Sequence, residues 1–239
     1  MAPHPPAHRT DPLPLAGGAA RPPASLGRLL LLAAALAGAA LPAAASAALP
    51  PLRAIGPGDA YFSDLFRSLG RQGAVRSAFA ESRWFPFRTE PVTLRGELRF
   101  SPGLGLSLHY TAPEERTVIF DSAGLLVRAP GGGGRAMPAD PHVGELGPTL
   151  LAIFRFDEAG IHRAFQVRGA HAGAAWEVEF TPRSAEALRW IGVIRVWGES
   201  GWVTRLEFRR SGSQRVQIDL TSATVPAVFS AEERRRYFR

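Results

Sequence analysis

The sequence predicts an α+β protein built on one large antiparallel sheet. Two stretches, Val92–Phe100 and Leu104–Tyr110, alternate apolar and polar residues, which is typical of strands with one apolar face. The turn Ser101-Pro102-Gly103 between them predicts an antiparallel hairpin. Further strand patterns follow without the alternation of strands and helices that a parallel sheet needs. A sheet of this size is expected to curl.

One amphipathic helix precedes the strands. Tyr61, Phe62, Leu65, Phe66 and Leu69 form an apolar stripe at helical spacing. Asp59 is placed to cap the start of this helix, and Gly70 and Gly73 mark its end. The apolar stripe is therefore expected to pack on the sheet.

About nine or ten strands are expected in all. Besides the hairpin, the patterns predict strands at Val75–Phe85, Arg116–Phe120, Leu125–Ala129, Ala164–Arg168, Ala175–Thr181, Arg189–Trp197, Trp202–Arg209 and Arg215–Thr221. Other segments break the strand pattern. They are a mobile glycine-rich loop at Pro130–Pro141, a helix or broken helix at His142–Asp157, a helical turn at Glu158–Arg163, and a short C-terminal helix with a capping box at Ser230 and Glu233.

The first 47 residues have the layout of a secretory signal. Basic residues end at Arg28, the uncharged run Leu29–Leu41 follows, and Ala45-Ser46-Ala47 is a small-residue cleavage motif. The apolar run is shorter than the roughly 20 residues of a spanning helix, and Pro42 ends it, so cleavage is preferred over a membrane anchor. We expect a signal peptide at 1–47 cleaved near Ala47, a Pro-rich lead-in at 48–58, one domain at 59–239, and a periplasmic location.

Composition excludes several classes of function. The sequence has no Cys, which removes disulfides, thiol nucleophiles and thiolate metal sites. The net charge of +7 comes from Arg alone, since Lys is absent, and no basic run is longer than Arg234-Arg235-Arg236. Such dispersed charge does not indicate nucleic-acid binding.

No catalytic constellation is recognisable. The histidines beyond the signal, His109, His142, His162 and His171, have no metal-ligand spacing, and Asp140, His142 and Glu145 are more easily explained as a solvated loop than as a metal site. The four glycines at 131–134 are not followed by a phosphate-binding Lys, and no nucleophile elbow occurs. The sequence therefore predicts a protein that is not an enzyme and that has no cofactor or resident metal.

The order of elements resembles the LolA-type periplasmic lipoprotein carriers. The similar pieces are the first helix, AVRSAFAESR, GELRFSPGLGLSLHYTAPEERTVIFDSAGLLV, TLLAIF, WEVEFTPRSAEALRWIGVIRV and WVTRLEFRRSGSQRVQIDLTSATV, which together extend over roughly Asp59–Val225. Two positions depart from the family. Ser101 stands where the carriers have Arg before the turn Pro, and Glu81 stands where they have Gln.

The resemblance implies a fold and a function. The fold is a single curved antiparallel sheet forming an incomplete, half-open β-barrel that helices close, with an apolar cavity for acyl chains. The implied cavity lining is Phe79, Leu94, Leu98, Phe100, Leu106, Leu108, Tyr110, Trp176, Val178 and Phe180. The implied lid residues are Leu146, Leu150, Leu151 and Phe154.

The expected function is a monomeric periplasmic lipid or lipoprotein carrier that shelters acyl chains during transfer towards the outer membrane. Its cargo is the acyl chains of lipoproteins or another lipid. Its implied protein partners are an inner-membrane transporter and an outer-membrane receptor, and nucleic acid is not a partner. A lipid- or lipoprotein-sensing regulatory module of the same fold is the alternative, and an enzyme acting on lipid is disfavoured because no acid, base or nucleophile cluster is recognisable.

Overall fold

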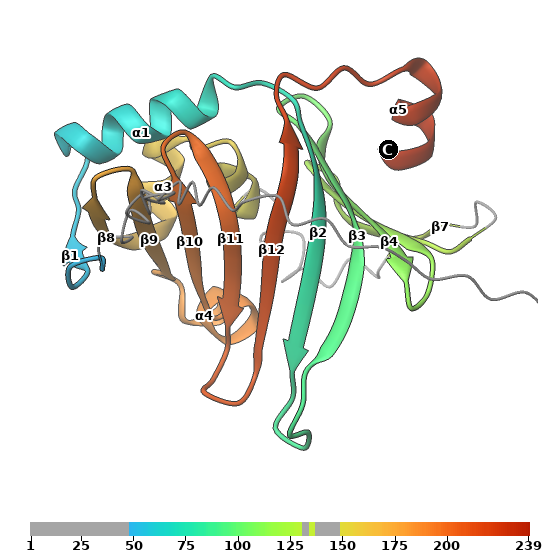
Figure 1. The fold of residues 1–239 in the computed structure, drawn as a ribbon, viewed down its shortest axis with the longest axis horizontal. Helices are drawn as coiled ribbons and strands as arrows, with labels where there is room; N and C mark the ends of the chain where they lie inside the picture. The colour runs from blue at the N-terminus through green and yellow to red at the C-terminus, as the bar shows by residue number, and fades with distance from the viewer. Residues whose placement is uncertain (1–47, 131–133, 137–148) are drawn as a thin grey trace, which may run out of the picture. The chain divides into compact units, whose positions relative to one another are not determined.

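The described residues contain one twelve-stranded sheet in which every neighbouring pair of strands is antiparallel. The structure is a computed structural model that describes residues 48–130, 134–136 and 149–239. The strand order is β1-β8-β9-β10-β11-β12-β2-β3-β4-β5-β6-β7, so among the described residues β1 and β7 are the edges and the sheet does not close (Figure 1). The α+β class with one antiparallel sheet is thus confirmed.

The sheet consists of two meanders joined at their middle. The first is β2 (Val75–Trp84), β3 (Val92–Ser101), β4 (Gly105–Ala112), β5 (Arg116–Asp121), β6 (Gly124–Arg128) and β7 (Gly134–Ala136). The second is β8 (Phe165–Ala172), β9 (Ala175–Pro182), β10 (Val193–Glu199), β11 (Trp202–Arg209) and β12 (Arg215–Thr224). β12 pairs with β2, which places Val216 opposite Arg83.

Short helices cover parts of the sheet. They are α1 (Ala60–Gly70), a helical segment at 149–154, α3 (Glu158–Ala164), α4 (Ala185–Ile191) and α5 (Ala231–Tyr237). The expected caps of the first and last helices are present: the Asp59 side chain accepts a hydrogen bond from the backbone N–H of Phe62, and Ser230 with Glu233 forms a capping box.

The apolar stripe of α1 packs on the inner face of β8 and β9, as expected. Phe62 lies over Gly169, where a Cβ would come within 2.5 Å of the ring. Further along the helix, Phe66 lies 6.4 Å from the ring of Phe180 on β9. Figure 1 shows α1 running across this side of the sheet. Gly169 is therefore required because its missing side chain lets the helix approach.

The outer face of the first meander carries α5. Glu233 forms an ion pair with Arg76 on β2, and the guanidinium of Arg99 on β3 lies 3.6 Å from the centre of the Tyr237 ring. Arg128 on β6 donates to the carbonyl oxygens of Arg235 and Arg236 at the end of the helix. The C-terminal helix thus stays off the inner face.

Three expectations about secondary structure are wrong. The strand expected at Arg189–Trp197 begins at Val193, because α4 includes Arg189 and ends in Gly192 with a φ of 77°. The lead-in contains β1 (Arg53–Ala54), and the loop expected at Pro130–Pro141 contains β7. β1 and β7 both arise because an exposed strand edge offers unpaired backbone groups that a passing chain satisfies.

Several sequence expectations fall outside the described residues. These are the signal segment 1–47, Asp140, His142, Glu145 and Leu146. Within the described ranges, no helix is long and apolar enough to cross a membrane.

Candidate functional site

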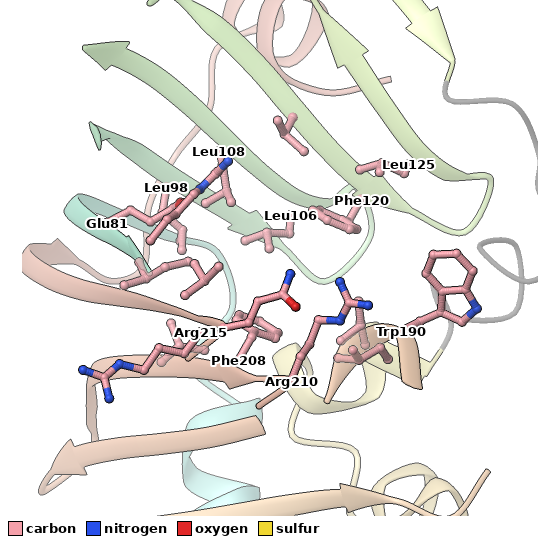
Figure 2. Close-up of a pocket in the computed structure, with 18 of the residues that line it drawn as sticks. Glu81, Leu98, Leu106, Leu108, Phe120, Leu125, Trp190, Phe208, Arg210 and Arg215 are labelled. Carbon is pink, nitrogen blue, oxygen red and sulfur yellow. The ribbon is translucent and has the colours of Figure 1, made fainter. Parts of the chain in front are cut away.

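A cavity of about 470 Å³ lies inside the curl of the sheet. Strands β3–β6 supply one wall, and β11, β12 and α4 supply the other (Figure 2). Leu98 on β3 and Leu206 on β11 both line it, although two strands, β12 and β2, lie between theirs in the sheet. Two inner-face residues so far apart in strand order share one cavity because the sheet curls, and this curl makes the open sheet a half-barrel.

The wall of the cavity is mainly apolar. Along most of these strands, every second residue contributes a side chain to the wall, because strand side chains alternate between the two faces of the sheet. The apolar lining residues are Trp84, Phe85, Leu98, Leu106, Leu108, Tyr110, Val118, Phe120, Leu125, Leu150, Phe154, Trp190, Ile191, Leu206, Phe208, Val216 and Ile218. The volume and the lining are typical of a site for a small apolar ligand or an acyl chain.

The ten residues expected to line the cavity fall into three groups. Leu98, Leu106, Leu108 and Tyr110 line it. Phe100 lines a second cavity of about 80 Å³ between the end of α1, residues 153–156 and strands β10–β12, β2 and β3. The remaining five are buried in the hydrophobic core, and they are Phe79, Leu94, Trp176, Val178 and Phe180.

Of the expected lid residues that the structure describes, two line the cavity and one is buried. Leu150 and Phe154, on the helical segment 149–154, line the cavity. Phe154 lies 6.5 Å from the ring of Phe100 and also lines the smaller cavity. Leu151 is buried, with 2% of its surface exposed. The segment 149–154 therefore closes one side of the main cavity.

Sequence reasoning missed the second wall and part of the first. Phe208 and Val216 on β11 and β12 follow the same alternation that identified the first hairpin. Val118, Phe120 and Leu125 instead lie in the continuous apolar runs Val118–Phe120 and Leu125–Val127, which do not indicate the face of each residue. Alternation was therefore a sufficient signal for Phe208 and Val216 alone.

Trp190 and Ile191 were missed because their segment was interpreted as a strand. The available signal was Ser184, whose side chain caps α4 by accepting from Ala187 N, followed by the helix-forming residues AEAL and by Gly192.

One charged cluster lies on the inner face. Glu81, with 1% of its surface exposed, accepts a hydrogen bond from the hydroxyl of Tyr110 at 2.6 Å and an ion-paired hydrogen bond from Arg83 Nε. Arg83 also donates to the Tyr110 hydroxyl at 3.3 Å. Because both Glu81 oxygens have donors, the buried carboxylate is compensated within the wall.

The cluster shifts the ionisation of its members. Burial, followed by the charge and hydrogen bond of Glu81, raises the pKa of Tyr110 above its usual range. Burial lowers the pKa of Arg83, but the hydrogen bond and charge of Glu81 outweigh it, so the pKa of Arg83 is raised. Arg83 therefore stays cationic and Tyr110 stays a neutral hydrogen-bond donor at neutral pH.

Gly96 makes this arrangement sterically feasible. A Cβ there would lie 2.1 Å from the carbonyl oxygen of His109 and 2.8 Å from the Phe79 ring. The rings of Phe79 and Tyr110 meet edge to face with 5.2 Å between their centres. The missing side chain thus lets the two rings meet beside Glu81.

His109 and Asp121 make contacts elsewhere and do not line this cavity. His109 lies on the outer face, 3.1 Å from the Thr117 hydroxyl, and burial and the charge of Arg99 lower its pKa. Asp121 accepts from Ala123 N at 2.8 Å and pairs with Arg239 at 3.0 Å. No cluster of three metal-ligating side chains occurs in the part of the chain that the structure describes.

The fold and the cavity define a half-barrel with an apolar interior. No protein-family model matches the chain, and no curated protein matches it. Solved structures do. A LolA superfamily protein from Nitrosomonas europaea matches at 8% identity over 70% of this chain and 94% of its own, with a TM-score of 0.36.

Two further solved structures also match. LprF from Mycobacterium bovis matches at 8% identity over 76% of this chain and 100% of its own, with a TM-score of 0.33. A MucA/MucB complex from Pseudomonas aeruginosa matches at 11% identity over 72% of this chain and 58% of the matched chain, with a TM-score of 0.38.

Proposed function

We propose that this protein is an exported carrier that shelters the acyl chains of a lipid or lipoprotein in its half-barrel. The observation that supports the proposal is the 470 Å³ cavity with its apolar wall. Each methylene group moved from water into such a wall gains roughly 0.8 kcal/mol. A chain of a dozen or so methylenes would therefore be held without any catalytic group.

The helical segment 149–154 is the proposed lid. Leu150 and Phe154 close one side of the cavity with apolar side chains, so moving this segment would open a path for an acyl chain without breaking a strand pair. Ser101, where the resembling carriers have Arg, ends β3 and pairs with Gly105. An apolar lid contact, rather than a cationic one, would then set how easily the cavity opens.

Bound lipid is the first test. We expect mass spectrometry of an organic extract of the purified protein to show copurified lipid, and a fluorescent fatty acid to bind and be displaced by oleate. Val118→Trp, which fills part of the cavity, should weaken probe binding about tenfold or more. The matched change Val228→Trp, at a residue that is 86% exposed, should not. Absence of both extracted lipid and probe binding would overturn the proposal.

A second experiment separates a carrier from a lipid-sensing module. A carrier should move a fluorescent lipid between donor and acceptor vesicles at a rate that rises with protein concentration. A sensor should bind the same lipid without accelerating its transfer.

Export to the periplasm is part of the proposal. N-terminal sequencing of the secreted protein should find a start near Ala48, whereas an intact Met1 would contradict export.

A further inference from the structure

The mouth of the cavity carries positive charge. The charged residues among its lining are Glu81, Arg83, Arg210 and Arg215. Glu81 and Arg83 neutralise each other in the buried cluster with Tyr110. The charge that is left belongs to two arginines, which flank the turn between β11 and β12.

Arg210 is the more exposed of the two. Its Nε donates to the backbone carbonyl oxygen of Arg189 at 3.3 Å, which ties its stem to α4 beside Trp190. No carboxylate in the described ranges forms an ion pair with it. Figure 2 shows its guanidinium extending from the β11–β12 side towards Phe120 on the opposite wall.

Arg215 lies on the other side of the same turn. Its guanidinium stacks on Trp84 with 4.1 Å to the ring centre, since the two residues are opposite each other in the β12–β2 pair. Its Nε is buried and has no hydrogen-bond partner within the described structure. A buried donor without a partner is uncommon and has an energetic cost.

The turn holds these groups together. The backbone N–H groups of Arg210 and Ser211 both donate to the carbonyl oxygen of Gln214, at 3.0 and 3.2 Å. Gln214 also lines the cavity. The turn therefore presents the Arg210 guanidinium and the Gln214 amide next to an apolar chamber, whereas the guanidinium of Arg215 extends away from it (Figure 2).

We propose that the ligand of this cavity is an amphiphile with an anionic headgroup, whose phosphate or carboxylate is bound by Arg210 with Gln214 beside it. The inference rests on the proposed function, because it requires the acyl chain to occupy the cavity. Guanidinium binds carboxylate and phosphate through paired, charge-assisted hydrogen bonds. A neutral headgroup would leave Arg210 unpaired, and a cationic one would be repelled.

Three probes with the same oleoyl chain test this inference. They are oleate, oleoyl lysophosphatidylglycerol and monooleoylglycerol, and their dissociation constants are measured by displacement of the fluorescent fatty acid. The anionic probes should bind about tenfold or more tightly than monooleoylglycerol. The ratio of oleate to lysophosphatidylglycerol affinity distinguishes a carboxylate headgroup from a phosphate headgroup.

Arg210→Gln should remove most of the preference for anionic probes, because it should weaken their binding far more than that of monooleoylglycerol, and Arg215→Gln should have a smaller effect. Arg205→Gln is the matched control, since Arg205 also lies on β11 but pairs with Asp219 and does not line the cavity. Equal affinity for all three probes, or an unchanged preference in Arg210→Gln, overturns the anionic headgroup while the carrier proposal stands. Failure of every probe to bind overturns both.

Discussion

On the side of β8, β9 and β10 the inner face of the sheet is covered by α1, whereas from β3 to β6 it faces β11 and β12 across a cavity. Both sides have the same alternation of apolar residues. Trp176 and Phe180 on the covered side have 0% of their surface exposed, while Phe120 and Leu125 on the cavity side are half-buried.

The difference follows from the length of the covering helix. α1 has 11 residues and so extends for about 16 Å, which is the width of three to four strands. A single short helix cannot cover the inner face of twelve strands. The part of the face that α1 does not reach either packs on the segment 149–154 or lines the cavity.

The largest change in stability is expected from replacing a Phe by Ala, which we compare between the region that α1 covers and the wall of the cavity. Phe180→Ala, in the covered region, should lower the free energy of unfolding by about 3–5 kcal/mol because it leaves a cavity in close-packed core. Phe120→Ala should lower it by only about 1–2 kcal/mol, since that ring is half-buried, but should weaken acyl-chain binding. Urea unfolding and probe binding measure the two effects. Equal losses of stability would show that the two regions are packed alike.

The next largest loss of stability is expected from a change in the cluster of Glu81, Arg83 and Tyr110. Tyr110→Phe removes the hydrogen bond to the Glu81 carboxylate and should lower the free energy of unfolding by about 1.5–3 kcal/mol at neutral pH. The loss should be seen by urea unfolding.

The same variant tests the raised pKa of Tyr110. Because that pKa lies above the ordinary value of 10.0, the unfolded state loses its proton first as the pH rises past 10, and the folded protein loses stability there. Tyr110→Phe should lack this alkaline component when melting temperatures are compared between pH 8 and 11.5. Tyr61, whose pKa burial also raises, contributes equally to both proteins. Identical alkaline slopes would contradict the assignment.

The smallest effect tests how closely α1 approaches the sheet. Gly169→Ala places a methyl group within 2.5 Å of the Phe62 ring, so the helix or the ring must shift, at a cost of about 1–3 kcal/mol. Gly201→Ala is the control, because a Cβ there has a 3.4 Å contact with the end of the Gln72 side chain. Lipid binding should be unchanged in both variants. A large loss of binding in Gly169→Ala would mean that the two regions are coupled.

The sequence by itself determined most of the strands, the two faces of those that alternate, and the caps at Asp59 and Ser230, because alternation and capping depend on neighbours along the chain. For the same reason, all ten residues expected to line a cavity are apolar inner-face residues.

Only the tertiary structure decided which of them border open space. That outcome depends on the reach of α1, on the pairing of β12 with β2, and on how far the sheet curls. It also decided that Arg210 meets the apolar chamber, since nothing near it in sequence indicates the opposite wall. The cavity is formed by residues far apart in the chain, and local patterns contain no information about the space between them.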